Sequence, residues 1–273
     1  MRNVLLMSGL LIQAGILGAQ PIFDYVAAPD ASFRWLVSAE PTANGLRVQM
    51  VSQVWQGIEW SHRVAVVRPS NCTHPELCVL LITGGDPGDE AFSLGSVMAQ
   101  STGTTIAVLG DIPNQPLFDD LSEDALISFT FSKYLETRDP TWPALYPMTK
   151  AAVRAMDMLQ ALSEQRWGQR IEGFVVAGGS KRGWTTWFTG EVDPRVRGII
   201  PIVYDNLNIP AQMREHLAQW GRYNEQIEDY TQRGLPDLIS SEEGAELAGM
   251  VDPYTYRDRA TMPKLIVNGT NDR

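Results

Sequence analysis

The residues best suited to chemistry surround Ser180, in the segment Val175-Val-Ala-Gly-Gly-Ser-Lys-Arg-Gly-Trp184. An apolar strand is predicted to end at two glycines, the serine follows, and a helix is predicted to begin directly behind it. A nucleophilic serine needs such a sharp turn, which lifts its hydroxyl out of the sheet. Gly178 fits Gly-x-Ser-x-Gly, but Arg182 occupies the place of the second glycine, and Gly183 comes one residue later. We interpret Ser180 as a nucleophile; the alternative is a serine that only caps the helix.

Backbone N–H groups at two turns could stabilise the oxyanion that forms when such a serine attacks a carbonyl. Gly84 and Gly85 directly follow an early apolar run, and Lys181 follows the serine. Where this turn is used, one donor comes from a loop behind an early strand and the other from the residue after the nucleophile. We therefore expect Lys181 and either Gly84 or Gly85 to supply the oxyanion donors.

The sequence offers candidates for the acid that would orient a catalytic histidine. Asp272 follows the apolar run 264–267 and a glycine turn, and Asp205, which follows the preceding apolar run, is the alternative. The expected chain order is serine, acid, histidine, yet only Arg273 follows Asp272. The sequence therefore predicts a serine hydrolase machinery that is truncated before its catalytic histidine.

None of the three histidines present matches the missing base. His62 lies in a predicted N-terminal strand, His74 lies between two cysteines, and His216 is expected on the surface of a helix. Without a base, Ser180 lacks an acceptor for its proton.

The elements that must position these residues follow an alternating pattern. Short apolar runs, typical of strands buried on both faces of a parallel sheet, occur at 78–83, 105–109, 173–177, 199–203 and 264–267. Apolar spacing over 147–164 indicates an amphipathic helix, and residues 183–191 are also predicted to be helical. Residues 46–60 and 63–69 predict an antiparallel strand pair. We expect an α/β fold with a mostly parallel sheet and helices on both faces.

Two segments lie outside this alternation. Residues 1–19 contain Arg2, an apolar run and small residues before Gln20, which is the pattern of a secretory signal peptide; the alternative is an uncleaved N-terminal anchor. Residues 206–250 interrupt the sheet and are predicted to form helices, either as a lid over the carboxyl ends of the strands or as an extra packing layer. We expect a signal peptide at 1–19 and one α/β domain at 20–273, with the insertion at about 206–250.

Composition limits the partners that we expect. The chain has 22 Lys and Arg against 32 Asp and Glu, a net charge of −10, which disfavours nucleic acid and anionic membrane surfaces. We expect a secreted or periplasmic protein with a small-molecule or peptide substrate, or with a protein partner. No cofactor is predicted, and no His and Cys cluster has the spacing of a metal site.

The two cysteines, Cys72 and Cys78, lie six residues apart. In an exported protein an even number of cysteines favours a disulfide. We therefore predict a bond between them; two free thiols in a surface loop are the alternative.

Several further motifs, taken together with the Ser180 turn, resemble one known family. They are Asn114-Gln-Pro-Leu117, Met148-Thr-Lys-Ala-Ala-Val-Arg-Ala-Met-Asp157, Pro210-Ala-Gln-Met213 and Val251-Asp-Pro-Tyr-Thr-Tyr-Arg-Asp-Arg259. Over about residues 25–273 the chain resembles the PhoPQ-activated pathogenicity-related family, which includes proteins of the autocrine proliferation repressor type.

The resemblance implies an α/β-hydrolase fold and a serine hydrolase, of esterase or peptidase type, with an undefined substrate. Ser180 and Asp272 match the presumed nucleophile and acid of the family. The family continues into a last strand and a histidine, which the present chain would lack. A non-catalytic secreted regulatory or binding protein is the alternative function.

Overall fold

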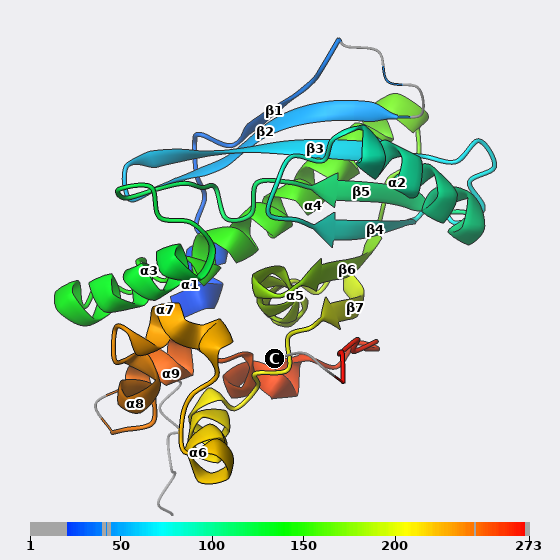
Figure 1. Cartoon of the computed structure of the whole chain (residues 1–273). Helices are drawn as coiled ribbons and strands as arrows, with labels where there is room; N and C mark the ends of the chain where they lie inside the picture. Colours follow the sequence, from blue (N-terminus) through cyan, green and yellow to red (C-terminus); the bar gives the residue numbers. More distant parts are fainter. Residues whose placement is uncertain (1–20, 40–41, 43–44, 243, 271–273) are drawn as a thin grey trace, which may run out of the picture.

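The protein is described by a computed structural model, which defines residues 21–39, 42, 45–242 and 244–270 (Figure 1). The predicted signal peptide at 1–19 and the predicted acid Asp272 lie outside these residues. Among the described residues no helix is both long enough and apolar enough to cross a bilayer.

A seven-stranded sheet forms the centre of the molecule, in the order β1-β2-β3-β5-β4-β6-β7. The strands are β1 (Arg34–Val37), β2 (Leu46–Trp55), β3 (Ile58–Val67), β4 (Leu77–Ile82), β5 (Thr105–Leu109), β6 (Gly173–Gly179) and β7 (Val196–Ile202). Strands β4 to β7 pair in parallel with one another. Strand β5 joins β3 in antiparallel fashion, and β3 continues antiparallel into β2 and β1. The predicted α/β class is confirmed, and so is an antiparallel N-terminal pair, although the turn between its strands lies at 56–57, inside the predicted first strand 46–60.

The last predicted strand, 264–267, follows the edge of β7 without forming a continuous ladder. Lys264 and Val267 form isolated parallel bridges to β7. The N–H of Leu265 donates to the Ile199 carbonyl at 3.0 Å. The side chains of Leu265 and Ile266 are 60% and 50% exposed. This segment therefore extends the sheet, but in the described part of the chain it carries no covering layer.

Helices cover both faces of the sheet. One face is covered by α2 (Asp89–Thr102), and the other by α1 (Pro21–Ala27), α4 (Leu145–Trp167) and α5 (Lys181–Val192). The sheet separates two hydrophobic cores, a larger one beneath α1, α4 and α5 and a smaller one beneath α2. Successive residues of a strand belong to different cores, because their side chains point to opposite faces of the sheet. Ala65 and Val67 of β3 pack with α2, whereas Val64 and Val66 belong to the larger core. The predicted helix at 147–164 is confirmed as part of α4.

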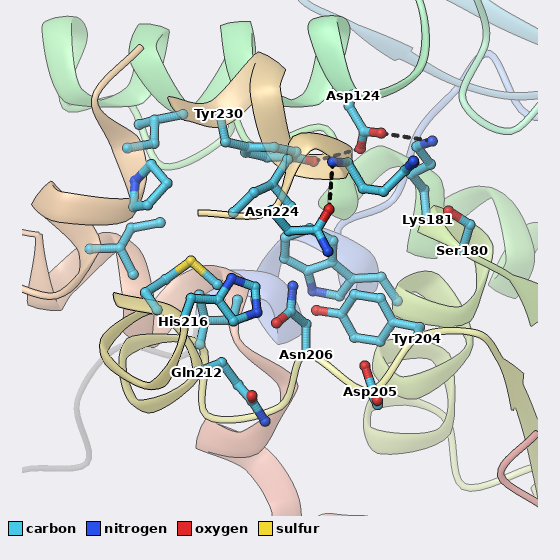
Figure 2. A pocket seen from close by; sticks show the side chains of 18 of the residues that line it. Asp124, Ser180, Lys181, Tyr204, Asp205, Asn206, Gln212, His216, Asn224 and Tyr230 are labelled. Carbon is cyan, nitrogen blue, oxygen red and sulfur yellow. Dashed lines mark hydrogen bonds and ion pairs between the residues drawn. The ribbon is translucent and has the colours of Figure 1, made fainter. Parts of the chain in front are cut away.

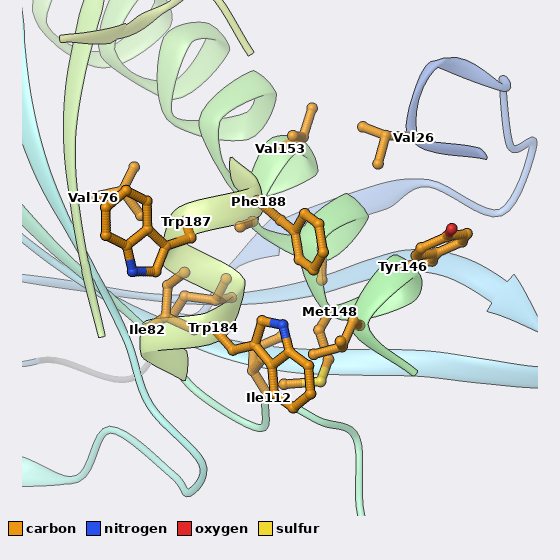
Figure 3. Close-up of a cluster of buried hydrophobic side chains, with 14 of the residues drawn as sticks. Val26, Ile82, Ile112, Tyr146, Met148, Val153, Val176, Trp184, Trp187 and Phe188 are labelled. Atoms are coloured by element: carbon orange, nitrogen blue, oxygen red, sulfur yellow. The ribbon is translucent and has the colours of Figure 1, made fainter. Parts of the chain in front are cut away.

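The larger core holds the helix behind Ser180 in place. Trp184, Trp187 and Phe188 of α5 are buried with Met148 of α4 and Val176 of β6 (Figure 3). Burial of a large apolar side chain contributes about 1.5–3 kcal/mol, so three such residues along α5 strongly favour one position of this helix. The turn at Ser180 thereby gains a rigid support.

Helical segments at 206–259 pack below the sheet in Figure 1. They are α6 (Ile209–Trp220), a 3-10 turn (Glu225–Ile227), α7 (Glu228–Thr231), α8 (Leu235–Ile239), α9 (Ala245–Val251) and a 3-10 helix (Pro253–Arg259). α3 (Glu123–Thr137) contacts α7 and α9. We call residues 208–252 the helical excursion.

The excursion begins and ends at one buried carboxylate. Asp252 accepts hydrogen bonds from the N–H groups of Asn208 at 3.2 Å and Ile209 at 2.7 Å, where α6 begins. It also accepts from the N–H of Tyr254 at 2.9 Å, and so caps the following 3-10 helix. One side chain therefore satisfies the donors of two helix starts.

The predicted disulfide is wrong for this structure, in which both cysteines are free thiols. Cys78 lies in β4, and its side chain is fully buried in the larger core. Cys72 lies before the strand and is half-buried. The spacing of six residues gave no information about the direction in which β4 points Cys78, and that direction is inward.

Candidate active site

Ser180 lies at a strained turn between β6 and α5. Its backbone angles are φ 56° and ψ −125°, a region that residues with a side chain rarely occupy. Such a conformation costs on the order of 1–3 kcal/mol and persists only where the surroundings enforce it. Here the N–H of Ser180 donates to the Ile202 carbonyl of β7 at 2.9 Å, and its carbonyl accepts from the N–H of Trp184 at 3.1 Å. The local geometry is that of a nucleophile elbow.

The glycines around Ser180 explain how the turn fits. A Cβ on Gly178 would lie 2.5 Å from the Arg182 carbonyl oxygen, and a Cβ on Gly183 would lie 2.8 Å from Cβ of Tyr204. Both contacts are too close for any side chain. Gly183 therefore allows α5 to approach the end of β7. It takes the packing role of the second glycine of the usual motif, although it stands one residue after the motif position.

Arg182 connects the elbow to the loop behind β4. Its side chain is 10% exposed. The Nε donates to the Ile112 carbonyl at 2.5 Å, and the two terminal nitrogens donate to the Glu123 carboxylate at 2.6 and 2.8 Å. A Cβ on Gly84 would lie only 1.8 Å from Nη2 of Arg182. The predicted oxyanion loop thus packs directly against the guanidinium.

Glu123 is held as a carboxylate by this arrangement. Burial raises the pKa of the Glu123 carboxyl, but hydrogen bonds from Arg182 and Gln115, with the charges of Arg182 and Lys181, outweigh burial and lower the pKa to about 2. The amide of Gln115 donates to Glu123 Oε1 at 2.5 Å and accepts from the Glu123 N–H at 2.8 Å. The guanidinium of Arg182 therefore has a fixed, charged partner at neutral pH.

The side chain of Lys181 is engaged in ion pairs. Its Nζ lies 2.8 Å from Asp124 Oδ2 and 3.3 Å from Glu123 Oε2, and the Tyr230 hydroxyl donates to Asp124 Oδ1 at 3.0 Å. Figure 2 shows this group beside Ser180. The Lys181 ammonium is thus held between two carboxylates and points away from a role in accepting the Ser180 proton.

A cavity of about 460 Å³ opens in front of Ser180 and Lys181. Its other walls come from the end of β7 and from the helical excursion (Figure 2). The lining includes Asp205, Asn206, Gln212, His216, Trp220, Asn224, Gln226, Tyr230 and Gly269. Gly84 and Gly85 do not line it. The structure thus brings Ser180 and Lys181 to one cavity with the alternative acid, Asp205.

Of the two candidate acids, Asp205 lies among the described residues. Asp205 is exposed at the cavity, and its Oδ2 lies 3.5 Å from Nδ2 of Asn268. Asp272, the preferred acid, lies outside the described residues. Asn268 belongs to the loop that leads toward position 272, so this loop passes close to Asp205.

Two histidines are remote from the cavity. His62 is buried in β3, with Nε2 2.9 Å from the Ser52 hydroxyl and Nδ1 3.2 Å from the Asp111 carbonyl. Burial lowers the pKa of the His62 imidazole to about 4, so His62 is a neutral core residue. His74 is exposed, with Nδ1 3.7 Å from Glu76 Oε1.

His216 is one of several cavity residues that we did not predict from the sequence. It lies on α6, its ring packs edge-on against Trp220 with centroids 5.2 Å apart, and both residues line the cavity. Its Nδ1 is buried without a hydrogen-bond partner among the described residues. The sequence spacing could have indicated this position. His216 lies three residues after Met213 and four before Trp220, which places all three near one face of α6.

Metal ligation has no evident centre in the described part of the chain. Among these residues no group of three or more His, Cys, Asp or Glu side chains is arranged to hold a metal ion.

Comparison with solved structures defines the class of fold. An acetyl xylan esterase from Paenibacillus sp. R4 superposes with a TM-score of 0.54 at 13% identity, covering 90% of this chain and 84% of that chain. A putative acetyl xylan esterase from Bacteroides fragilis gives 0.50 at 14% identity, over 91% and 72%. With the sheet order and the elbow, this likeness defines an α/β-hydrolase fold.

The sequence places the protein more narrowly. Residues 22–273 match the family described as PhoPQ-activated pathogenicity-related protein, and the chain belongs to that family. It is 34% identical over 291 aligned positions to autocrine proliferation repressor protein A of Dictyostelium discoideum. The alignment covers 100% of this chain and 58% of the relative, so the chain spans little more than half of the relative's length.

Proposed function

We propose that this protein is a secreted serine hydrolase that cleaves an ester or amide bond with Ser180 as the nucleophile. The observation that carries the proposal is the conformation of Ser180, a non-glycine residue at φ 56° between a strand and a helix, at the wall of a cavity. A helix cap does not require this conformation, because capping residues ordinarily adopt extended angles.

The proposed reaction is acyl transfer to water. The Ser180 Oγ bonds to the substrate carbonyl carbon and gives its proton to a base, while the carbonyl oxygen takes up negative charge. The N–H groups of Lys181 and of Gly84 or Gly85 are the proposed donors to this oxyanion. The carbonyl re-forms, the bond to the alcohol or amine breaks, and the leaving group takes the proton. Water then cleaves the acyl-serine.

The remaining roles are proposals about the acid and the base. Asp272 is the preferred acid and Asp205 the alternative, because in the sequence each follows an apolar run that comes after the Ser180 turn. The order serine, acid, histidine places the base after Asp272. The 273 residues hold no histidine there.

A second candidate function is that of a non-catalytic secreted regulator. The name of the 34% identical relative, a proliferation repressor, favours it. In that case the cavity would bind a partner without turnover. The apolar run at 1–19 supports export in both candidates.

A fluorophosphonate probe tests the first candidate on the full-length protein. We expect the folded protein to be labelled at Ser180, as located by peptide mass spectrometry, and Ser180→Ala to abolish this labelling and any ester turnover. Ser93→Ala, on the exposed surface of α2, is the matched control and should be labelled normally. A folded protein that resists the probe, yet changes cell proliferation when added to medium, would favour the regulator.

A further inference from the structure

The cavity in front of Ser180 is lined by several amide side chains. Asn206, Gln212 and Gln226 line it. Among the described residues their side chains form no hydrogen bonds. Asn224 uses its Oδ1 to accept from the Gln226 N–H at 2.8 Å, which leaves its NH₂ group available. Each amide offers both donors and an acceptor, so together they match a ligand whose own groups both donate and accept.

The charges of the described lining do not suit an anion. The Lys181 ammonium is neutralised by Asp124 at 2.8 Å. Asp205 and Glu215 are exposed carboxylates in the lining. An anionic ligand would meet these two negative charges and no unpaired Lys or Arg among the described lining residues, which favours a neutral ligand.

An aromatic surface lies at the edge of the cavity. Trp220 is 65% exposed, although a large apolar side chain ordinarily gains by burial. It packs edge-on against His216 one helical turn earlier, at an interplanar angle of 63°. An exposed indole provides a flat apolar surface, on which the C–H face of a pyranose or furanose ring stacks well.

The apolar residues of the lining are mostly inaccessible. Met213, Leu235 and Ile239 are 3%, 1% and 5% exposed, so they offer little surface to a fatty acyl chain or to apolar peptide side chains. Apart from Val203, which is 38% exposed, the described lining presents to a ligand mainly the amides, the two carboxylates and the indole of Trp220.

We propose that this cavity binds a neutral saccharide, and that the substrate is its O-acyl ester. The proposal rests on the proposed function, because the ester must reach Ser180. The Ser180 Oγ takes the acyl group, the bond between the acyl carbon and the sugar oxygen breaks, and the sugar oxygen takes the proton from the base. Water then releases the carboxylic acid and restores the serine.

Binding without turnover separates this proposal from the proposed function. The test uses the full-length Ser180→Ala protein and calorimetric titration with xylotriose, cellotriose and maltotriose as neutral probes. Trigalacturonate serves as the anionic probe and blocked trialanine as the peptide probe. We expect saturable binding of at least one neutral trisaccharide, in preference to the other two probe types, whether or not the unmutated protein hydrolyses esters.

Variants locate the binding. Trp220→Ala and Asn206→Ala should each weaken binding of the neutral trisaccharide at least tenfold. Leu217→Ala is the matched control, because Leu217 is an exposed residue of the same helix outside the lining, and it should bind as before. Preference for trigalacturonate or trialanine, failure of all three neutral sugars, or unchanged binding by Trp220→Ala would overturn the proposal. Failure of probe labelling at Ser180 alone would instead overturn the catalytic role.

Discussion

The guanidinium of Arg182 occupies the space into which a side chain on Gly84 would project, with 1.8 Å between Nη2 and the Cβ position. The elbow and the loop behind β4 are separate in sequence by almost a hundred residues, and this contact sets their spacing. Arg182, which stands where the motif has its second glycine, thus connects the two turns that are the proposed sources of oxyanion donors.

Gly84→Ala tests this contact. The guanidinium has little freedom to move, because it is bonded to Ile112 and Glu123. We expect a loss of about 1–3 kcal/mol in the free energy of unfolding and a large loss of Ser180 labelling. Gly88→Ala is the control, since a Cβ there meets nothing within 4 Å and Gly88 has no proposed catalytic role. Equal stability and labelling of the two variants in urea titration and probe assays would show that the contact is unimportant.

Arg182→Lys tests the fork that binds Glu123. Breaking a fully buried ion pair costs about 3–5 kcal/mol. We expect a smaller loss of stability here, because the Glu123 side chain is 39% exposed and lysine retains the charge but not the two parallel hydrogen bonds. Labelling of Ser180 should slow at a temperature where the variant is fully folded. Arg170→Lys, in an exposed pair with Glu164, should change the stability by less than about 1 kcal/mol. Labelling at the unmutated rate would remove Arg182 from the positioning role.

Glu191 predicts a pH dependence of stability. It lies near the end of α5, 5% exposed, and its Oε2 has no hydrogen-bond partner among the described residues. Burial, with the charge of Asp252, raises the pKa of the Glu191 carboxyl from 4.5 to about 9. The folded protein therefore binds a proton that the unfolded chain releases. Its stability should fall as pH rises from 4.5 to 9, by up to about 1.4 kcal/mol per pH unit.

Glu191→Gln removes that proton uptake while keeping the shape of the side chain. We expect the variant and the unmutated protein to have similar free energies of unfolding at pH 5, and the variant to be more stable by at least about 2 kcal/mol at pH 8. Glu164→Gln, at a side chain 62% exposed, is the control and should show no such divergence. Parallel stability curves for Glu191→Gln and the unmutated protein would mean that Glu191 is ionised in the fold.

The cysteines give a prediction that thiol counting can check. Burial raises the pKa of the Cys78 thiol, and its side chain is inaccessible, so Cys78 should resist alkylation in the native protein. Cys72 should react. The denatured, unreduced protein should show two thiols, and a count of zero would restore the disulfide.

Features formed by residues close together in the sequence could be predicted, whereas features formed by tertiary packing could not. The Ser180 turn could be predicted because the strand, the glycines and the helix lie within ten residues. The parallel strands could be predicted because burial on both faces leaves continuous apolar runs, as in β5. The cavity could not, since His216 and Trp220 reach it only through the packing of α6. The disulfide prediction was wrong because the inward direction of Cys78 depends on the register of β4.

Asp252 holds the two ends of the helical excursion together, so that the segment between them can be exchanged as a unit. The chain enters the excursion at Asn208 and leaves it at Asp252, and these two residues are joined by a hydrogen bond of 3.2 Å. A segment whose ends nearly touch can be lengthened, shortened or replaced while the sheet keeps its geometry, because loop closure depends only weakly on length. Related chains could therefore acquire new ligand preferences by replacing residues 209–251 as a unit, with the Ser180 turn inherited intact.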